Sequence, residues 1–220
     1  MPVDLLWNSP PDPIATLVLA HGAGAAMDSA WMTGFAELLE ERGIRVARFE
    51  FDYMAARRTG ARKPAPKAER VLDEDRAAVA EAVAVVGGAV YIGGKSYGGR
   101  VASMVADELH GAGSVEGLVC LGYPFHPPGA PEKLRTSHLL ELRTPALICQ
   151  GTRDPFGTRE EVAGYGLPAS IRFCWLEDGE HEFKPRKAVS GFTHREHLVT
   201  AAEAVREFVT EGEARAPHER

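Results

Sequence analysis

The sequence predicts an α/β fold in which a mostly parallel central sheet is flanked by helices on both faces. Short apolar runs alternate with longer amphipathic stretches along the whole 220-residue chain. Strands and helices that alternate in this way typically form a parallel sheet, because each connection crosses back over the sheet through a helix. No internal repeat or linker divides the chain. We therefore expect one domain over residues 1–220, with its core at about 15–210 and a polar tail at 211–220.

The expected strands are short apolar runs, and the expected helices are longer stretches with apolar residues three or four positions apart. We expect strands at 17–21, 45–51, 89–92, 117–121, 145–150 and 171–176. We expect helices at 30–42 and 71–86, after residue 99, and after capping-box sequences that begin at Thr158 and Thr193. The stretches 53–67 and 122–145, rich in proline and polar side chains, are expected to be loops.

The composition argues against a nucleic-acid-binding or membrane-spanning protein. Hydrophobic residues make up 45% of the chain and charged residues 25%, and the net charge of −6 leaves no basic excess. No apolar run approaches the length of a membrane span. The three cysteines lie in apolar runs without the spacing of a zinc site, and no secretory leader is recognisable. We expect buried free thiols, a cytoplasmic location, and no metal or organic cofactor.

The most informative motif is Gly94-Lys95-Ser96-Tyr97-Gly98, which joins an apolar run to an amphipathic stretch. A sharp turn between a strand and a helix holds a serine hydroxyl exposed at the edge of a sheet, with helix N-terminal N–H groups behind it. The two glycines suit such a turn because side chains there would collide with neighbouring backbone. Ser96 is therefore the candidate nucleophile.

A serine nucleophile needs a base and an acid that orients the base, and two later strands end in such residues. Asp154 follows the strand at 145–150, and His181 follows the strand at 171–176. The order serine, aspartate, histidine is the one found in this kind of sheet. The alternative acids are Asp178 and Glu177. The alternative bases are His194 and His197, which lie at or in the final helix.

The first strand ends in His21-Gly22-Ala23-Gly24, a glycine-rich turn that can direct backbone N–H groups at a developing oxyanion. We expect the N–H groups of Ala23 and Tyr97 to form the oxyanion hole. His21 is expected to position this loop rather than to transfer a proton.

With these motifs in view, the chain resembles α/β-hydrolase-fold proteins of the small, cap-less, dienelactone-hydrolase-like kind. It is most similar to the group that contains the testis-expressed hydrolase-like proteins and the hydrolase-like subunit of the nonspecific-lethal chromatin complex. The resemblance spans roughly residues 15–210 and rests on the following stretches: 21–24, 93–100, Gly122-Tyr123-Pro124-Phe125-His126-Pro127-Pro128-Gly129, 151–154 and His181. Dienelactone hydrolases proper use a cysteine nucleophile, whereas Ser96 stands in that place here. The resemblance implies the fold and a hydrolase-like site without a particular substrate.

The stretch 122–145 is too short and too proline-rich for a helical cap, which predicts an open site and small or exposed substrates. We expect His21 to lie near the substrate, together with three side chains that follow the apolar run at 117–121: Tyr123, Phe125 and His126. Two arginines in the 53–67 loop, Arg57 and Arg58, are also expected there. Arginine suits a carboxylate or phosphate group. The alternatives are a stiff connecting loop at 123–126 and a solvated loop at 53–67.

The sequence thus predicts a serine hydrolase that cleaves a small ester or thioester through an acyl-enzyme, with no nucleic-acid or membrane partner. A nucleotide-binding reading of Gly94-Lys95-Ser96 fails because a P-loop needs a glycine where Ala89 stands. The alternative function is a catalytically weak or inactive hydrolase-fold protein that acts as a binding or scaffold module with a protein partner, since a fold does not prove an activity.

Overall fold

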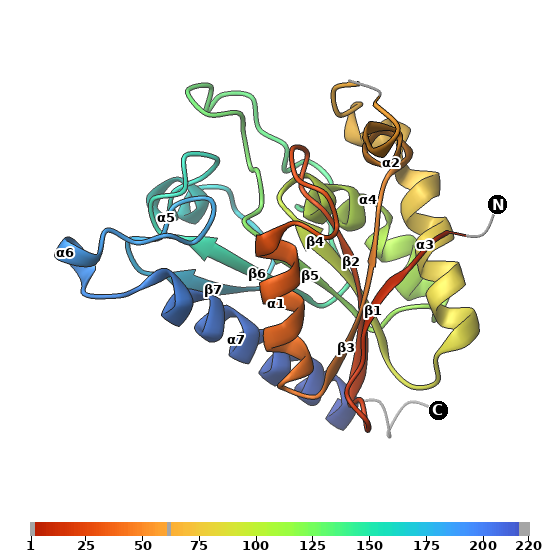
Figure 1. Ribbon diagram of the computed structural model, residues 1–220. Helices are drawn as coiled ribbons and strands as arrows, with labels where there is room; N and C mark the ends of the chain where they lie inside the picture. The colour runs from red at the N-terminus through yellow and green to blue at the C-terminus, as the bar shows by residue number, and fades with distance from the viewer. Residues whose placement is uncertain (1–2, 61–62, 216–220) are drawn as a thin grey trace.

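A computed structural model describes residues 3–60 and 63–215 of the chain. Its centre is one seven-stranded sheet (Figure 1). The strands are β1 (Leu6–Asn8), β2 (Ala15–Ala20), β3 (Ile44–Phe49), β4 (Val90–Lys95), β5 (Gly117–Leu121), β6 (Ala146–Gly151) and β7 (Ile171–Leu176). They lie in the order β1-β3-β2-β4-β5-β6-β7, with β1 antiparallel to β3 and all other pairs parallel.

Helices cover both faces of this sheet, as the sequence predicted (Figure 1). They are α1 (Ala30–Glu40), α2 (Asp52–Arg58), the 3₁₀ turn η1 (Ala68–Arg70), α3 (Leu72–Val85), α4 (Tyr97–Gly111), α5 (Arg159–Ala163), α6 (Lys187–Ser190) and α7 (His194–Arg215). The pair α1 and α7 packs on one face, and the pair α3 and α4 on the other. Within the described ranges no helical cap is inserted, so the predicted fold class is confirmed.

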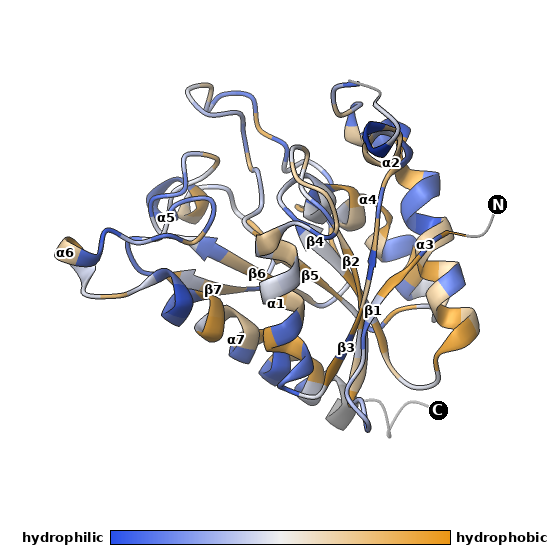
Figure 2. Cartoon of the chain, viewed as in Figure 1, coloured by the Kyte–Doolittle hydropathy of each residue, from blue (hydrophilic) through white to orange (hydrophobic). Residues whose placement is uncertain are grey.

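The strands are continuous apolar runs because both of their faces are buried. Every residue of β2, β4, β5 and β6 is buried. Side chains alternate between the two faces: Val18 and Ala20 join the cluster beneath α3 and α4, whereas Leu17 and Leu19 join the one beneath α1 and α7. Figure 2 shows the result as hydrophobic strands at the centre and hydrophilic stretches on the outer sides of the helices.

Both predicted capping boxes are present. The N–H of Glu161 donates to Thr158 Oγ1, and the N–H of Thr158 donates to the Glu161 carboxylate. The Thr193–Glu196 pair makes the same reciprocal bonds at the start of α7. These bonds satisfy backbone donors that have no partner within a helix.

Two expectations about regular structure were wrong. The 53–67 stretch, expected as a loop, begins with helix α2, whose first turn carries Asp52 and whose last turn carries Arg57 and Arg58. That charge arrangement complements the helix dipole and favours a helix, although the glycine and prolines later in the stretch indicated a loop. The polar tail expected at 211–220 was wrong for residues 211–215, because α7 continues to Arg215; residues 216–220 lie outside the described residues.

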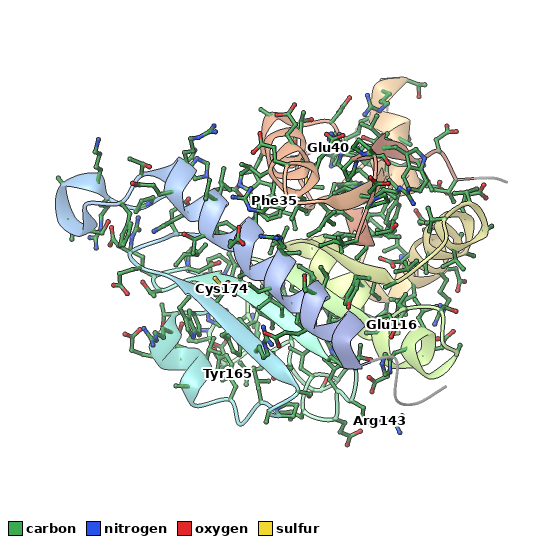
Figure 3. All side chains as sticks on the ribbon, turned by 90° about the horizontal axis from the view of Figure 1, so that it is seen from below. Phe35, Glu40, Glu116, Arg143, Tyr165 and Cys174 are labelled. Carbon is green, nitrogen blue, oxygen red and sulfur yellow. The ribbon has the colours of Figure 1, made fainter. Side chains whose placement is uncertain are left out.

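Helix α7 lies across the sheet when the molecule is seen from below, with Cys174 of β7 beside it (Figure 3). Cys120 and Cys149 are buried free thiols as expected, whereas Cys174 is half-buried because β7 is an edge strand. Although α7 is 22 residues long, neither it nor any other helix in the described ranges is long and apolar enough to cross a membrane.

The strand order places a crevice between β2 and β4. The chain leaves β2 toward β3 on one side and returns to β4 on the other side, so the connections that follow β2 and β4 diverge. Ligands of open α/β sheets bind at such a switch point, outside the carboxyl ends of the strands. The glycine loop after β2 and the Ser96 turn after β4 both lie at this point.

Candidate active site

Ser96 occupies a strained turn between β4 and α4. Its φ of 50° and ψ of −109° are rarely adopted by a residue with a side chain. The turn is possible because glycines flank it: a Cβ on Gly94 would lie 2.4 Å from the carbonyl carbon of Gly98, and one on Gly98 would lie 2.6 Å from the carbonyl oxygen of His21. The N–H of Ser96 donates to the carbonyl of Leu121 at 2.9 Å, which ties the turn to β5.

Ser96, His181 and Asp154 form a continuous hydrogen-bonded chain. Ser96 Oγ lies 2.8 Å from His181 Nε2, and His181 Nδ1 lies 2.8 Å from Asp154 Oδ2. A carboxylate at Nδ1 accepts that N–H and leaves Nε2 free to accept the serine proton. The Phe156 ring lies against the imidazole with centroids 4.2 Å apart, which limits rotation of the His181 ring.

Asp154 is fully buried and fixed by three donors. The N–H of Phe156 donates to Oδ1 at 2.8 Å, and Gln150 Nε2 and His181 Nδ1 donate to Oδ2. Gln150, which is also fully buried, accepts the N–H of Tyr123 at 2.7 Å and so links the acid to the chain that follows β5. We did not expect a role for Gln150 from the sequence; the signal was a polar residue within an otherwise apolar strand.

The alternative acids lie away from Ser96. Asp178 pairs with Arg186 and Arg153, and the hydrogen bonds from Arg186 lower the pKa of its carboxyl to about 2. Glu177 is exposed.

The alternative bases form hydrogen bonds with backbone carbonyl groups and not with Ser96. His194 Nε2 donates to the carbonyl of Glu182 at 2.8 Å, and His197 Nδ1 donates to the carbonyl of Phe183 at 2.9 Å. Of the candidate acids and bases, the structure therefore brings only Asp154 and His181 together at Ser96.

His21 anchors the glycine loop. Its Nδ1 lies 2.7 Å from the carbonyl of Gly22, and its Nε2 accepts the N–H of Phe51 at 3.2 Å. These partners fix a neutral imidazole with its proton on Nδ1, and burial lowers its pKa. Tyr53 from α2 donates its hydroxyl to the carbonyl of Ala23 at 3.1 Å, so the loop is held from two sides.

Two backbone donors remain free beside Ser96. In the described part of the chain, no acceptor pairs with the N–H of Ala23 or with that of Tyr97, the first residue of α4. Ala23 lines the same cavity as Ser96. Unpaired N–H groups at this place are what an oxyanion hole requires.

A cavity of about 220 Å³ adjoins Ser96. Its walls come from the glycine loop, the start of α1 and the two catalytic loops: Gly22, Ala23, Gly24, Ala25, Ser29, Trp31, Met32, Lys95, Ser96, His181 and Glu182. The wall toward α1 is mostly apolar, whereas Lys95 and Glu182 form an ion pair of 3.1 Å on the His181 side. Trp31 and Glu182 were not among the residues expected near the substrate.

The expected substrate residues after β5 lie elsewhere. Tyr123 and Phe125 are fully buried, and His126 is almost so. Tyr123 donates its hydroxyl to the carbonyl of Arg135, and Phe125 packs on Tyr123 with ring centroids 4.8 Å apart. None of the three lines the cavity beside Ser96.

The two arginines of α2 are engaged locally. Arg57 donates to the carbonyl of Lys63 at 2.9 Å and lies over the Tyr53 ring. Arg58 pairs with Glu50 at 2.7 Å and with Asp28 at 3.0 Å. Neither arginine lines the cavity, so neither contacts the region next to Ser96.

A larger groove of about 360 Å³ lies between α5 and the edge strand β7. Its lining is apolar and aromatic apart from Arg159, and it contains neither Ser96 nor His181. It offers no nucleophile or base, so the smaller cavity is the candidate active site.

The fold and this site define a class of protein, the α/β hydrolases. The model of the α/β-hydrolase domain family matches residues 13–210, and the chain therefore belongs to that family.

Several solved structures have the same fold. A serine hydrolase without a lid from Xanthomonas campestris has 20% identity and a TM-score of 0.67, with 97% of this chain and 88% of that chain covered. A dienelactone hydrolase from Anabaena variabilis has 21% identity and a TM-score of 0.67, with 93% and 89% covered. Est1E from Butyrivibrio proteoclasticus, with ferulic acid bound, has 16% identity and a TM-score of 0.68, with 97% and 96% covered.

These likenesses show that the chain shares the α/β-hydrolase fold of these structures, without an inserted cap in the residues that the structure describes. Its likeness to the testis-expressed group stays a prediction.

Proposed function

We propose that this protein is a serine hydrolase that cleaves a small ester or thioester through an acyl-enzyme. The observation that carries the proposal is the chain of two 2.8 Å hydrogen bonds from Ser96 through His181 to the buried Asp154. A serine hydroxyl is a poor nucleophile at neutral pH, and a base at hydrogen-bond distance is what activates it.

In this mechanism Ser96 Oγ attacks the carbonyl carbon of the substrate while His181 Nε2 takes the serine proton. Asp154 keeps the imidazole in the required tautomer and stabilises its cation. The free N–H groups of Ala23 and Tyr97 would stabilise the oxyanion, and His181 then gives its proton to the leaving group. Water, activated by His181, hydrolyses the acyl-enzyme in the same way. The steps need no metal or organic cofactor.

The cavity favours a small acyl group. Its volume of about 220 Å³ is below the range of about 300–1,000 Å³ that is usual for drug-sized ligands. Trp31 and Met32 make the α1 side apolar, which suits a short alkyl or aryl chain better than a charged one. Because the three cysteines are free thiols, we also propose a reducing, cytoplasmic location.

The test is labelling of the protein with a fluorophosphonate probe, which reacts only with activated serines. We expect wild type to be labelled and Ser96→Ala and His181→Ala not to be. Ser190→Ala and His110→Ala, on α6 and α4, are matched controls and should be labelled like wild type. If folded wild type were not labelled, the proposal would fail, and the binding or scaffold alternative would be favoured.

A further inference from the structure

The loop that carries His181 has almost no regular structure of its own. It connects β7 to α6, and two of its residues other than glycine, Asp178 and Phe183, have left-handed φ values of 56° and 66°. Such conformations persist only where surrounding contacts hold them. The position of the catalytic imidazole therefore depends on what fixes this loop.

Several carbonyl groups of this loop accept hydrogen bonds from side chains outside it. Arg153 donates to those of Asp178 and Lys184, and other elements donate to the three between His181 and Phe183. Lys95 Nζ donates to the carbonyl of His181 at 3.0 Å. The carbonyls of Glu182 and Phe183 accept from α7, through His194 and His197. Two of these three hydrogen bonds thus come from α7, the helix that covers one face of the sheet. Only Lys95 comes from the strand that carries the nucleophile, and it acts on the carbonyl of the catalytic histidine itself.

The Lys95 ammonium is enclosed. Its side chain is 6% exposed, and its Nζ pairs with Glu182 at 3.1 Å and lies 5.5 Å from the centre of the Trp31 ring. Burial lowers its pKa, whereas the charge of Glu182 opposes that shift. The ammonium is buried although its partner Glu182 is 44% exposed, and an apolar side chain at position 95 would avoid the desolvation of that charge. The presence of lysine here is therefore not explained by stability alone.

Gly122 explains how this contact is accommodated. A Cβ on Gly122 would lie 3.1 Å from the carbonyl oxygen of His181, 3.4 Å from Lys95 Nζ and 3.5 Å from Cε1 of the His181 ring. The ammonium and the imidazole thus flank a single point that a side chain would fill. Gly122, the first residue of the 122–129 stretch, thus leaves room for the link between Lys95 and His181.

We propose that Lys95 is a positioning residue that fixes His181 relative to Ser96 by joining the histidine loop to the nucleophile strand. This inference rests on the proposed serine hydrolase function. Lys95 precedes Ser96 directly in the chain, so its bond to the carbonyl of His181 closes a short path between nucleophile and base. With that bond lost, the imidazole would keep Asp154 as a partner but would lose its fixed direction toward Ser96 Oγ and the leaving-group oxygen.

A positioning role has a signature that a loss of folded protein lacks. His181 transfers a proton twice during acylation, once from Ser96 and once to the leaving group. p-Nitrophenolate departs without much help from an acid, whereas p-methoxyphenolate is a stronger base and depends more on that second transfer. A displaced imidazole should therefore slow acylation more for p-methoxyphenyl acetate. A smaller folded fraction would slow both esters equally.

The experiment measures kcat/KM of wild type and Lys95→Met for acetate esters of substituted phenols, from p-nitrophenyl to p-methoxyphenyl. Rates are expressed per active serine, titrated with a fluorophosphonate. We expect Lys95→Met to lose about tenfold more on the p-methoxyphenyl ester than on the p-nitrophenyl ester, a part of the 100- to 10,000-fold contribution typical of general acid–base catalysis. Val79→Ala, a core substitution in α3, is the stability control: per active serine it should leave both rates, and hence their ratio, unchanged.

An equal loss on both esters, or no loss, in Lys95→Met would overturn the inference. If Lys95→Met does not fold, Gly122→Ala disturbs the same contact by placing a methyl group between Lys95 and His181, and the same unequal loss is expected. Hydrolysis of none of the esters by wild type would refute the proposed function itself. An active wild type with an unchanged leaving-group dependence in both variants would refute only the role of Lys95.

Discussion

Gln150 offers the sharpest test of how the acid is held. Its side-chain amide accepts the N–H of Tyr123 at 2.7 Å and donates to the carboxylate of Asp154 at 3.0 Å and to the carbonyl of Gly157 at 3.3 Å, all without exposure to solvent. Gln150→Leu keeps a similar volume but removes every one of these bonds. We expect the variant to lose both stability and reactivity of Ser96.

The loss of stability in Gln150→Leu depends on which buried groups lose their only hydrogen-bond partner. Asp154 Oδ2 keeps its bond from His181, whereas the buried N–H of Tyr123 and the carbonyl of Gly157 lose theirs. A buried backbone group left without a partner costs about 1–3 kcal/mol, so the two together cost about 2–6 kcal/mol. The better burial of leucine offsets part of this, and we expect a net loss of about 3 kcal/mol.

Urea unfolding at pH 7 measures this loss as a lower midpoint with an unchanged slope. The rate of fluorophosphonate labelling should fall about tenfold as well, because Asp154 then holds His181 less firmly. Thr144→Val is the matched control: it removes a buried hydroxyl that donates to Asp107, and it should lower stability without changing the labelling rate. A loss of less than about 1 kcal/mol in Gln150→Leu would refute the reasoning.

Three further predictions concern the Ser96 turn and one partly buried histidine. Because Ser96 has a φ of 50°, Ser96→Gly should be more stable than Ser96→Ala by about 1 kcal/mol in urea unfolding, although neither is labelled. Gly98→Ala places a methyl group 2.6 Å from the carbonyl oxygen of His21, so we expect a loss of about 1–3 kcal/mol by thermal or urea unfolding, and slower labelling. Burial lowers the pKa of His138 from 6.5 to about 4, so the unfolded chain binds more protons between these values and stability falls as the pH drops through this window. Because His138 is only partly buried, solvent screening reduces this effect, and wild type should lose about 1 kcal/mol more than His138→Gln between pH 7 and pH 5; an equal loss would contradict the prediction.

Much of the fold could be predicted because its signals are local. The strands are short apolar runs, and each predicted strand agrees with an observed one to within a few residues. The edge strand β1 was missed, since its three residues are too few to show a pattern. The Ser96 turn and the positions of Asp154 and His181 followed from the order of three residues at strand ends, because the carboxyl ends of parallel strands meet at one edge.

Contacts between distant residues could not be predicted in the same way. Nothing in the sequence around Lys95 indicates that its ammonium meets the carbonyl of a residue 86 positions later. Tyr123 and Phe125 show the converse error. Two aromatic residues at a strand end suggest a pocket wall, but the hydroxyl of Tyr123 finds the carbonyl of Arg135 and its ring turns into the core. Aromatic residues with one polar tip fit either place, and only the fold decides between them.

The buried polar residues of this site have a common explanation in its open architecture. In the described residues no cap domain packs on the loops that carry Ser96, Asp154 and His181, so contacts with the sheet and its connections must fix the geometry of these loops. Gln150 fixes the acid, His21 fixes the glycine loop, and we infer that Lys95 fixes the base. Each ties its loop by bonding a backbone carbonyl or N–H, which apolar side chains cannot do. If the proposed function holds, polar burial at these three positions is the expected consequence of a cap-less site that must hold its reacting groups in a fixed arrangement.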